Sequence, residues 1–178
     1  MDLGVISVRY ARALLKSAVE QKREAEVYRE MQTLAQSYLQ VPGLRLTIDN
    51  PMLGRDKKRM VLETAVGGTP TGLTSRFLQL VLKEQRESTL QLMDNAYVTL
   101  YRKQKNITRG QLTTAVPVSP ETERRMKQMV ERKTHGTVEF NTEVDPDILG
   151  RFILEYDTYR MDASVKSKLN SILVQLRK

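Results

Sequence analysis

The chain has 178 residues and a formal net charge of +8 at pH 7, with 29 lysines and arginines against 21 aspartates and glutamates. This length allows one domain or two small ones, and the absence of cysteine excludes disulfides, thiolate nucleophiles and cysteine-ligated metal centres. No apolar run approaches the roughly 18 residues that cross a bilayer, and the first residues lack the pattern of a secretion or import signal, so we expect neither membrane insertion nor export.

The first predicted element is a helix over residues 5–22, on which apolar or small side chains form two adjacent stripes. One stripe contains Val8, Ala11, Leu15 and Ala18, and the other contains Ile6, Tyr10, Ala13, Leu14 and Ser17. Both stripes could pack into a core, or one could pack inward while the other contacts a partner helix. The residues alone favour neither alternative.

Four further segments before residue 106 carry apolar side chains with helical spacing. These segments are residues 24–39, 55–65, 71–85 and 88–105. A short apolar segment, residues 44–48, runs into Asn50 and Pro51, where the proline disfavours helical geometry in the residue before it. About six helices are therefore expected in this part of the chain.

After Lys105 the hydrophobic period changes from helical to alternating, so we place a domain boundary there. Residues 107–118 predict a strand, and Ser119 with Pro120 predicts the start of a helix that runs to about Lys133 and is ended by Gly136. Three more strands are expected around residues 138–144, 152–154 and 159–161, with a turn at 145–147 after the first of them. Ser164 is expected to cap a closing amphipathic helix.

The positive charge is spread widely and is mixed with acids. Lysine and arginine outnumber aspartate and glutamate by 17 to 11 up to Lys105 and by 12 to 10 after it. Only residues 55–59, Arg-Asp-Lys-Lys-Arg, form a basic cluster, and we interpret it as a solvated helix face rather than a phosphate site. A basic nucleic-acid-binding module remains an alternative function, although the chain lacks a concentrated basic stripe and the aromatic ribonucleoprotein signature.

No motif predicts catalysis, a cofactor or a metal. The loop from Gly67 to Thr74 has the outer glycine spacing of a phosphate loop but lacks its lysine, so we expect an interhelical loop. His135 is the only histidine and is expected to interact with a helix end. Asp145 and Asp147 flank Pro146, which favours a turn over an acid pair. A small enzyme remains possible only if folding assembles an acid–base group in a pocket.

Several short motifs, in order along the chain, resemble the delta subunit of bacterial ATP synthase, called the oligomycin-sensitivity-conferring protein in mitochondria. They are Arg9 to Leu14, Asn50-Pro51 before a basic helix, Phe77 to Glu84, Asp145 to Gly150, and Met161 to Leu169. The last two resemble the family's usual Val-Asp-Pro-Ser-Leu-Ile-Gly-Gly and Asp-Gly-Ser-Val-Arg-Gly-Arg-Leu. The similarity covers essentially the whole chain.

The chain departs from the family pattern at a few positions. Glu84 to Ser88 stands where the family often has Glu-Asn-Gly-Arg-Leu after the fifth helix, and the turn there has one residue fewer; Arg151 and Ala163 stand where glycine is common. Lys166 and Lys168 replace arginines, which keeps the charge but removes bidentate hydrogen bonding.

The resemblance implies an α+β fold: a six-helix bundle over residues 1–105, followed by a small α/β domain over 106–178 with a mixed sheet and two helices. It implies a stator subunit that resists rotor torque, in which the first domain binds N-terminal helices of alpha subunits and the second binds the b subunits. The expected location is the cytoplasmic face of the bacterial inner membrane. No cofactor, nucleic acid, direct membrane insertion or homo-oligomer is expected.

With the resemblance, the second stripe of the first helix gains a role as one wall of an alpha-binding groove, and the fifth helix supplies the other. The predicted groove residues are Tyr10, Ala13, Leu14, Phe77, Leu78 and Val81. A contact with the b subunits is expected on the closing helix, at Val165, Leu169, Ile172 and Leu173.

Overall fold

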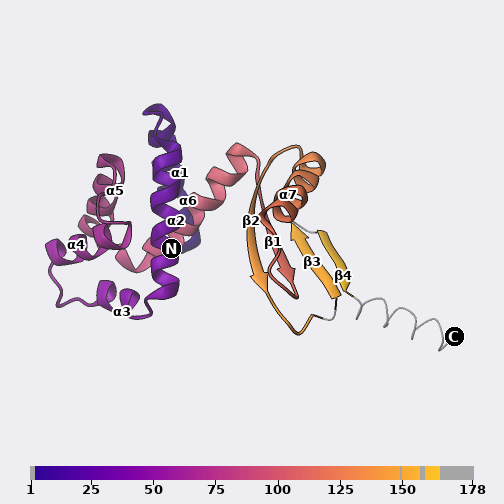
Figure 1. Ribbon diagram of the computed structural model, residues 1–178. Helices are drawn as coiled ribbons and strands as arrows, with labels where there is room; N and C mark the ends of the chain where they lie inside the picture. Colours follow the sequence, from indigo (N-terminus) through magenta and orange to yellow (C-terminus); the bar gives the residue numbers. More distant parts are fainter. Residues whose placement is uncertain (1–2, 149, 157–158, 165–178) are drawn as a thin grey trace. The chain divides into compact units, whose positions relative to one another are not determined.

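A computed structural model describes residues 3–148, 150–156 and 159–164 of the chain. Within these residues the fold is α+β, with seven α-helices and a four-stranded mixed sheet (Figure 1). The chain forms two compact units, residues 1–103 and 104–178. The predicted closing helix after Ser164 lies outside the described residues.

Helices make up the regular structure described before residue 106. They are α1 Leu3–Glu20, α2 Glu24–Gln40, α3 Gly43–Asp49, α4 Arg55–Ala65, α5 Gly72–Lys83, the 3-10 helix η1 Glu87–Thr89, and α6 Leu90–Lys105. The short apolar segment at 44–48 is the helix α3, in which Leu44 and Ile48, one turn apart, are both buried. Because α3 has only seven residues, its hydrophobic pattern covers too few turns to reveal the helical period.

The core of the helical unit is built from the inward stripes of these helices. Fully buried side chains from α1, α2, α4, α5 and α6 include Ala11, Val27, Met31, Leu34, Leu62, Leu78, Val81, Met93 and Tyr97. The rings of Tyr28 in α2 and Tyr101 in α6 stack with their centroids 4.2 Å apart. The hydroxyl of the buried Tyr97 donates to the carbonyl oxygen of Glu24 at 3.3 Å, so its polar end is satisfied.

Three of these helices end in the same way, at a residue in the left-handed region. Lys22 and Gln85, with φ of 56° and 54°, follow α1 and α5, and Gly67, with φ of 119°, follows α4. The next backbone N–H in each case reaches back five residues, as from Arg86 to the carbonyl of Val81 at 3.0 Å, which is the Schellman arrangement. The shortened turn at residues 84–88 therefore closes with a glutamine in a conformation that glycine adopts more easily.

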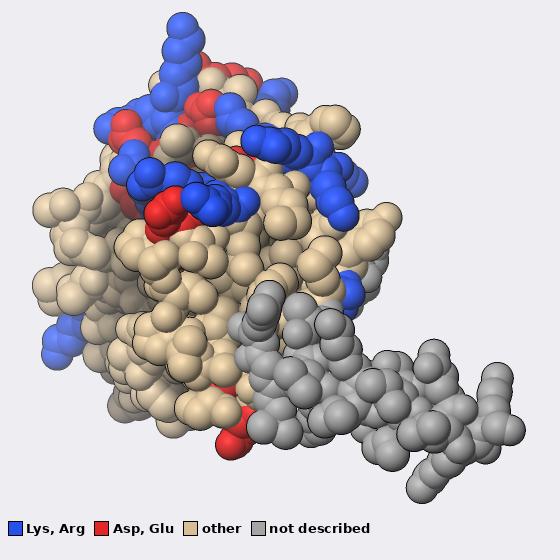
Figure 2. Space-filling model, turned by 45° about the vertical axis from the view of Figure 1, so that its right-hand side comes forward, with Lys and Arg blue, Asp and Glu red and all other residues tan. Residues whose placement is uncertain are grey.

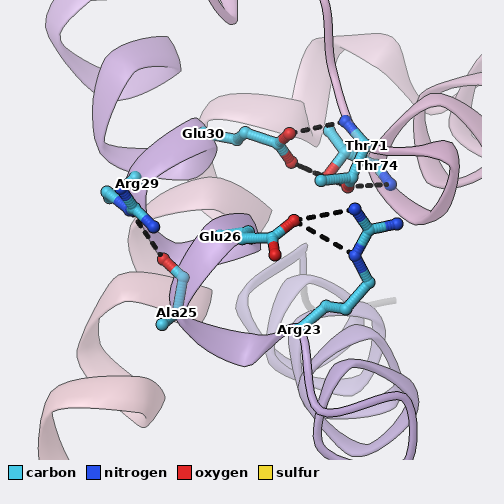
Figure 3. Close-up of polar contacts among 7 residues, drawn as sticks. All are labelled: Arg23, Ala25, Glu26, Arg29, Glu30, Thr71 and Thr74. Atoms are coloured by element: carbon cyan, nitrogen blue, oxygen red, sulfur yellow. Dashed lines mark hydrogen bonds and ion pairs between the residues drawn. The ribbon is translucent and has the colours of Figure 1, made fainter.

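The glycine-containing loop before α5 is an interhelical junction, as predicted. Thr71 caps α5 by accepting a hydrogen bond from the backbone N–H of Thr74 at 3.3 Å. Glu30 of α2 accepts from the N–H of Thr71 at 2.5 Å and from the hydroxyls of Thr71 and Thr74 (Figure 3). The carboxylate thus fixes the positive N-terminal end of α5 against α2.

The basic cluster at residues 55–59 is not entirely the solvated helix face that was predicted, because Lys58 is buried. Its side chain is only 6% exposed, and its Nζ lies 2.6 Å from Oε1 of Glu87 in η1. Of the other members, Arg55, Asp56 and Lys57 are exposed as expected, and Arg59 is half-buried. A buried lysine needs a paired carboxylate, and the partner here is 29 residues away in sequence.

The second unit contains one described helix and four strands. The elements are β1 Ile107–Thr114, α7 Pro120–Thr134, β2 Thr137–Val144, β3 Gly150–Tyr156 and β4 Tyr159–Ser164. The strand order is β2-β1-β3-β4; β1 pairs with β2 in parallel and with β3 antiparallel, and β4 is antiparallel to β3. A helical crossover, α7, makes the parallel pairing of β1 and β2 possible.

One face of the sheet forms a small core with α7. Its buried members are Leu112, Val130, Val138, Leu154 and Tyr156. On β2 the ring of Phe140 lies opposite Gly110 of β1, and a Cβ at Gly110 would come within 2.5 Å of that ring. The close approach explains a glycine in the middle of a strand.

The ends of α7 are partly as predicted. The Ser119 hydroxyl accepts from the N–H of Thr122 at 3.3 Å, which confirms the N-cap. The helix ends, however, at His135, which has a φ of 51°, and not through a left-handed Gly136. Glycine is required at 136 for another reason, because a Cβ there would overlap the carbonyl oxygen of Asn106.

The predicted turn after β2 is confirmed. The N–H of Asp147 donates to Oδ1 of Asp145 at 3.0 Å, which is an Asx turn. The N–H of Asp145 also donates to the carbonyl of Thr114 at 2.8 Å, near the end of β1. The strand β1 ends at Thr114, four residues before the predicted limit at 118.

Candidate partner-binding groove

An open groove of about 380 Å³ lies between α1 and α5. The lining residues are Arg9, Tyr10, Ala13, Leu14 and Ser17 from α1, and Leu73, Arg76, Phe77 and Leu80 from α5. On each helix they occupy one stripe at helical spacing, while the neighbouring stripe is in the core. Each helix is thus anchored on one side and open to the groove on the other.

Four of the six predicted groove residues line this groove. Ala13 is exposed and Tyr10 half-buried, whereas Leu14 and Phe77 are largely covered but still contribute to the surface. The two predicted stripes of α1 separate only in part. Ala11, Leu15 and Ala18 of the first are buried and most of the second borders the groove, but Ile6 of the second is buried too. The stripes are not cleanly divided, because Val8 of the first is 38% exposed.

The prediction that Leu78 and Val81 line the groove is wrong. Both side chains are 0% exposed and belong to the core of the helical unit. The wide apolar arc of α5 contains two stripes, and the groove stripe is Leu73, Phe77 and Leu80. Their spacing of four and three residues is a signal that the sequence carries, but burial was needed to separate this stripe from its neighbour.

One wall of the groove is held in place from outside the two helices. The Nη1 of Arg86, just after α5, donates to the hydroxyl of Tyr10 at 3.2 Å. The guanidinium carbon of Arg86 also lies 5.4 Å from the centroid of the Tyr10 ring, within range of a cation–π interaction. Arg86 therefore connects the turn after α5 to the α1 wall of the groove.

Outside the groove, the described residues show one acid in an unusual environment. Asp94 of α6 is fully buried, and neither of its carboxylate oxygens has a hydrogen-bond partner there. Burial raises the pKa of Asp94 to about 8. A single buried acid is not an acid–base constellation, so we give it no catalytic role.

Metal-binding groups, membrane-spanning helices and the predicted b-subunit contacts also bear on the site. In the part of the chain that the structure describes, no group of three or more histidine, aspartate or glutamate side chains could hold a metal ion. No helix among those residues is long and apolar enough to span a membrane. The predicted b-subunit contacts, Val165, Leu169, Ile172 and Leu173, lie outside the described residues.

The observations so far define an α+β protein with an open apolar groove between two helices, the geometry of helix-in-groove recognition. The family model described as "ATP synthase delta (OSCP) subunit" matches residues 6–176. The chain belongs to this family, which confirms the resemblance seen in its motifs. Members are structural, non-catalytic components of the peripheral stalk of F-type ATP synthase, and this chain is one of them. This assignment replaces the nucleic-acid-binding alternative.

Relatives with similar sequences are named ATP synthase subunit delta. The protein from Phocaeicola vulgatus is 47% identical over 98% of this chain and 95% of its own length. The protein from Bacteroides fragilis is 42% identical over the same shares of both chains. The protein from Enterococcus hirae is 30% identical over 100% of this chain and 99% of its own.

A solved structure supports the fold. A chain in the cryo-EM structure of the Toxoplasma gondii mitochondrial ATP synthase hexamer, a composite model, is similar with a TM-score of 0.68. The match covers 97% of each chain at 20% sequence identity. The arrangement of helices and strands is therefore shared between sequences that have diverged widely.

Proposed function

We propose that this chain ties the catalytic head of an ATP synthase to its peripheral stalk, with the α1–α5 groove as the attachment point for the head. The occupant of the groove is the N-terminal helix of an alpha subunit. The second unit binds the b subunits. The observation that carries the proposal is the open apolar groove between two helices that are otherwise packed into the core.

The groove is suited to bind a helix. Ala13 presents only a methyl group, which allows another helix to approach closely, while Tyr10 and Phe77 offer broad aromatic surfaces. Leu73 and Leu80 extend the apolar wall along α5. An amphipathic helix would bury its apolar stripe against these side chains.

The walls of the groove are also rigid. Glu30 holds the start of α5 to α2, and Arg86 holds Tyr10 near the end of α5. A site whose walls are already ordered loses little conformational entropy on binding. Such stiffness is what a stator needs, because it must transmit torque without yielding.

The remaining parts of the proposal follow the two units. A six-helix bundle over residues 1–105 takes the head-binding role, and residues 106–178 take the stalk-binding role. The protein works as a single copy, without cofactors, as a peripheral subunit at the cytoplasmic face of a bacterial inner membrane. It reaches the membrane through the b subunits and not by inserting into the bilayer.

The groove is tested with two variants of the full chain, Ala13→Arg and Leu80→Asp, titrated with a peptide of the alpha-subunit N-terminus. Leu80 is 46% exposed, so the aspartate is tolerated in the free protein but is buried on binding. A charge desolvated in the groove should weaken binding by a few kcal/mol, about a hundredfold in affinity. Calorimetric titration measures the affinity, and circular dichroism with thermal melting checks the fold.

The control variants carry the same substitutions away from the groove. Leu92→Asp changes a leucine of α6 that is 47% exposed, and Ala25→Arg changes an exposed alanine of α2. Both should bind the peptide as the wild type does. Equal affinity in all four folded variants would place the alpha-binding surface elsewhere.

A further inference from the structure

We propose that the helix recognised by the groove is acidic, with carboxylates on both sides of its apolar stripe. The inference rests on the proposed function only in that the groove is a helix-binding site. It adds the chemistry of the partner, which the apolar lining does not specify. The charges around the groove carry the argument.

Both helices that form the groove carry cations and almost no acids. From Leu3 to Val19, α1 has no aspartate or glutamate, and its only acid is the terminal Glu20. Helix α5 has no acid at all within Gly72–Lys83. Arg9 on one wall and Arg76 on the other both line the groove.

The surplus of positive charge extends along α1. Arg12 and Lys16, both exposed, follow Arg9 at spacings of three and four residues. From Arg9 to Lys16 the helix rises by seven residue steps, or about 10 Å along its axis. Like charges at these spacings repel one another and destabilise the helix, so a row of this kind is unfavourable until an anion lies beside it.

In the described part of the chain, these cations also have no ion-pair partner. No ion pair among the described residues involves Arg9, Arg12, Lys16 or Arg76. Arg76 uses its Nε to donate to the carbonyl of Gly72 at 3.1 Å, and its terminal nitrogens have no carboxylate partner in that part of the chain.

On another helix of the chain, acids lie among the cations. On α7, Arg125 pairs with Glu121 at 2.6 Å and Lys127 with Glu131 at 4.0 Å. On the face of the molecule shown in Figure 2, lysine and arginine gather toward the top, but acidic side chains lie among them. Helix α7 thus has acids within ion-pair distance of its cations, whereas the groove-lining stretches of α1 and α5 have none.

The occupant that fits is an amphipathic helix from another protein. Its apolar side chains would lie on the groove floor, and aspartates or glutamates one turn apart would face Arg9, Arg12 and Lys16 on one side and Arg76 on the other. Complementary charges at the rim of an interface raise the association rate and fix the orientation of the partner. The interaction should therefore weaken as salt increases.

The test uses two synthetic 18-residue helical peptides with the same apolar stripe. One carries glutamate at the flanking positions and the other carries glutamine. The full chain should bind the glutamate peptide at least about tenfold more tightly in 50 mM salt, and the preference should shrink in 500 mM salt. In the double variant Arg9→Glu/Arg76→Glu the preference should disappear or reverse.

The matched control is Lys57→Glu/Lys103→Glu, which makes the same change in net charge at exposed sites outside the groove. It should keep the preference for the glutamate peptide. Equal binding of both peptides, abolished by Ala13→Arg, would overturn the acidic-partner inference and leave the proposed groove intact. Binding of neither peptide would overturn it as well, and the alpha-peptide titration then decides separately whether the groove binds a helix.

A third probe separates a helix from any polyanion. A single-stranded oligonucleotide of random sequence should bind weakly and without dependence on Ala13. If it binds as tightly as the glutamate peptide and loses affinity equally in Arg9→Glu/Arg76→Glu, the cations form a general anion surface and the inference is wrong.

Discussion

The protonation of Asp94 couples the stability of the helical unit to pH. Its carboxyl group is fully buried on α6 and has no hydrogen-bond partner among the described residues. Removal from water favours the neutral form, so burial raises the pKa of Asp94 to about 8. Burial, and then the nearby Asp94, also raise the pKa of the Tyr38 phenol.

This environment predicts a pH-dependent stability. Unfolded aspartate titrates near pH 4, so between about pH 4 and 8 the folded protein keeps a proton that the unfolded chain releases. The stabilisation that comes from this retained proton is fully present below the pKa of Asp94 in the unfolded chain. It is lost as pH rises toward the pKa of Asp94 in the folded protein. From pH 6 to 8 the free energy of unfolding should fall by roughly 2 to 3 kcal/mol.

Asp94→Asn should remove this dependence, because an amide does not titrate. Urea unfolding at pH 6, 7, 8 and 9 measures it, with Asp56→Asn at an exposed position of α4 as the control. The control should follow the wild type. Curves for Asp94→Asn and the wild type that run parallel across this range would show that Asp94 titrates normally.

Between elements, the Lys58–Glu87 pair connects α4 to η1. Burial alone would raise the pKa of the Glu87 carboxyl, but the hydrogen bond and the charge of Lys58 outweigh it and lower the pKa. The second carboxylate oxygen of Glu87 has no hydrogen-bond partner in the described part of the chain. The hydrogen-bonding capacity of the pair is thus only partly satisfied, and each buried charge is stabilised by the opposite charge of its partner.

Removing one partner should be worse than removing both. Lys58→Met leaves the Glu87 carboxylate buried and unpaired, and should destabilise the fold by about 3 kcal/mol. In the double variant Lys58→Met/Glu87→Met the loss should be clearly smaller. Chemical denaturation measures the wild type, the single variants Lys58→Met and Glu87→Met, and the double variant, and Lys57→Met serves as an exposed control. A double variant that loses the sum of the two single effects would contradict this account.

The helical elements could be predicted from the sequence because their apolar side chains recur over several turns. The limits of α4 agree with the prediction, and α2 differs from it by one residue. Features that depend on distant residues could not be predicted. The burial of Lys58 requires Glu87, and the required glycine at 136 reflects the backbone of Asn106.

The groove could likewise be predicted only as far as it depends on helical spacing. Helical spacing on α1 and α5 indicated two apolar stripes on each helix, and the family resemblance suggested which helices to pair. Which stripe faces the core is decided by the packing of the other helices, so Leu78 and Val81 were assigned to the wrong side. Arg9 and Arg76 were missed because charged side chains on exposed helix faces are common and rarely form a site.

At the scale of the whole molecule, a stator must hold two partners at once. The helical unit offers the groove, and the second unit presents a mixed sheet with α7 against one face. Neither attachment alone resists torque, since the head would turn with the rotor if either contact failed. The proposed function therefore requires both units in one chain.

The most direct test of this account is whether the full chain bridges the head and the stalk. A tagged alpha–beta head is mixed with the soluble part of the b subunits, with or without the chain, and retained on affinity resin. The b subunits should be retained only when the wild-type chain is present. Ala13→Arg should lose the head but still bind b in solution. Equal retention of b without the chain, or unchanged bridging by Ala13→Arg, would contradict the account.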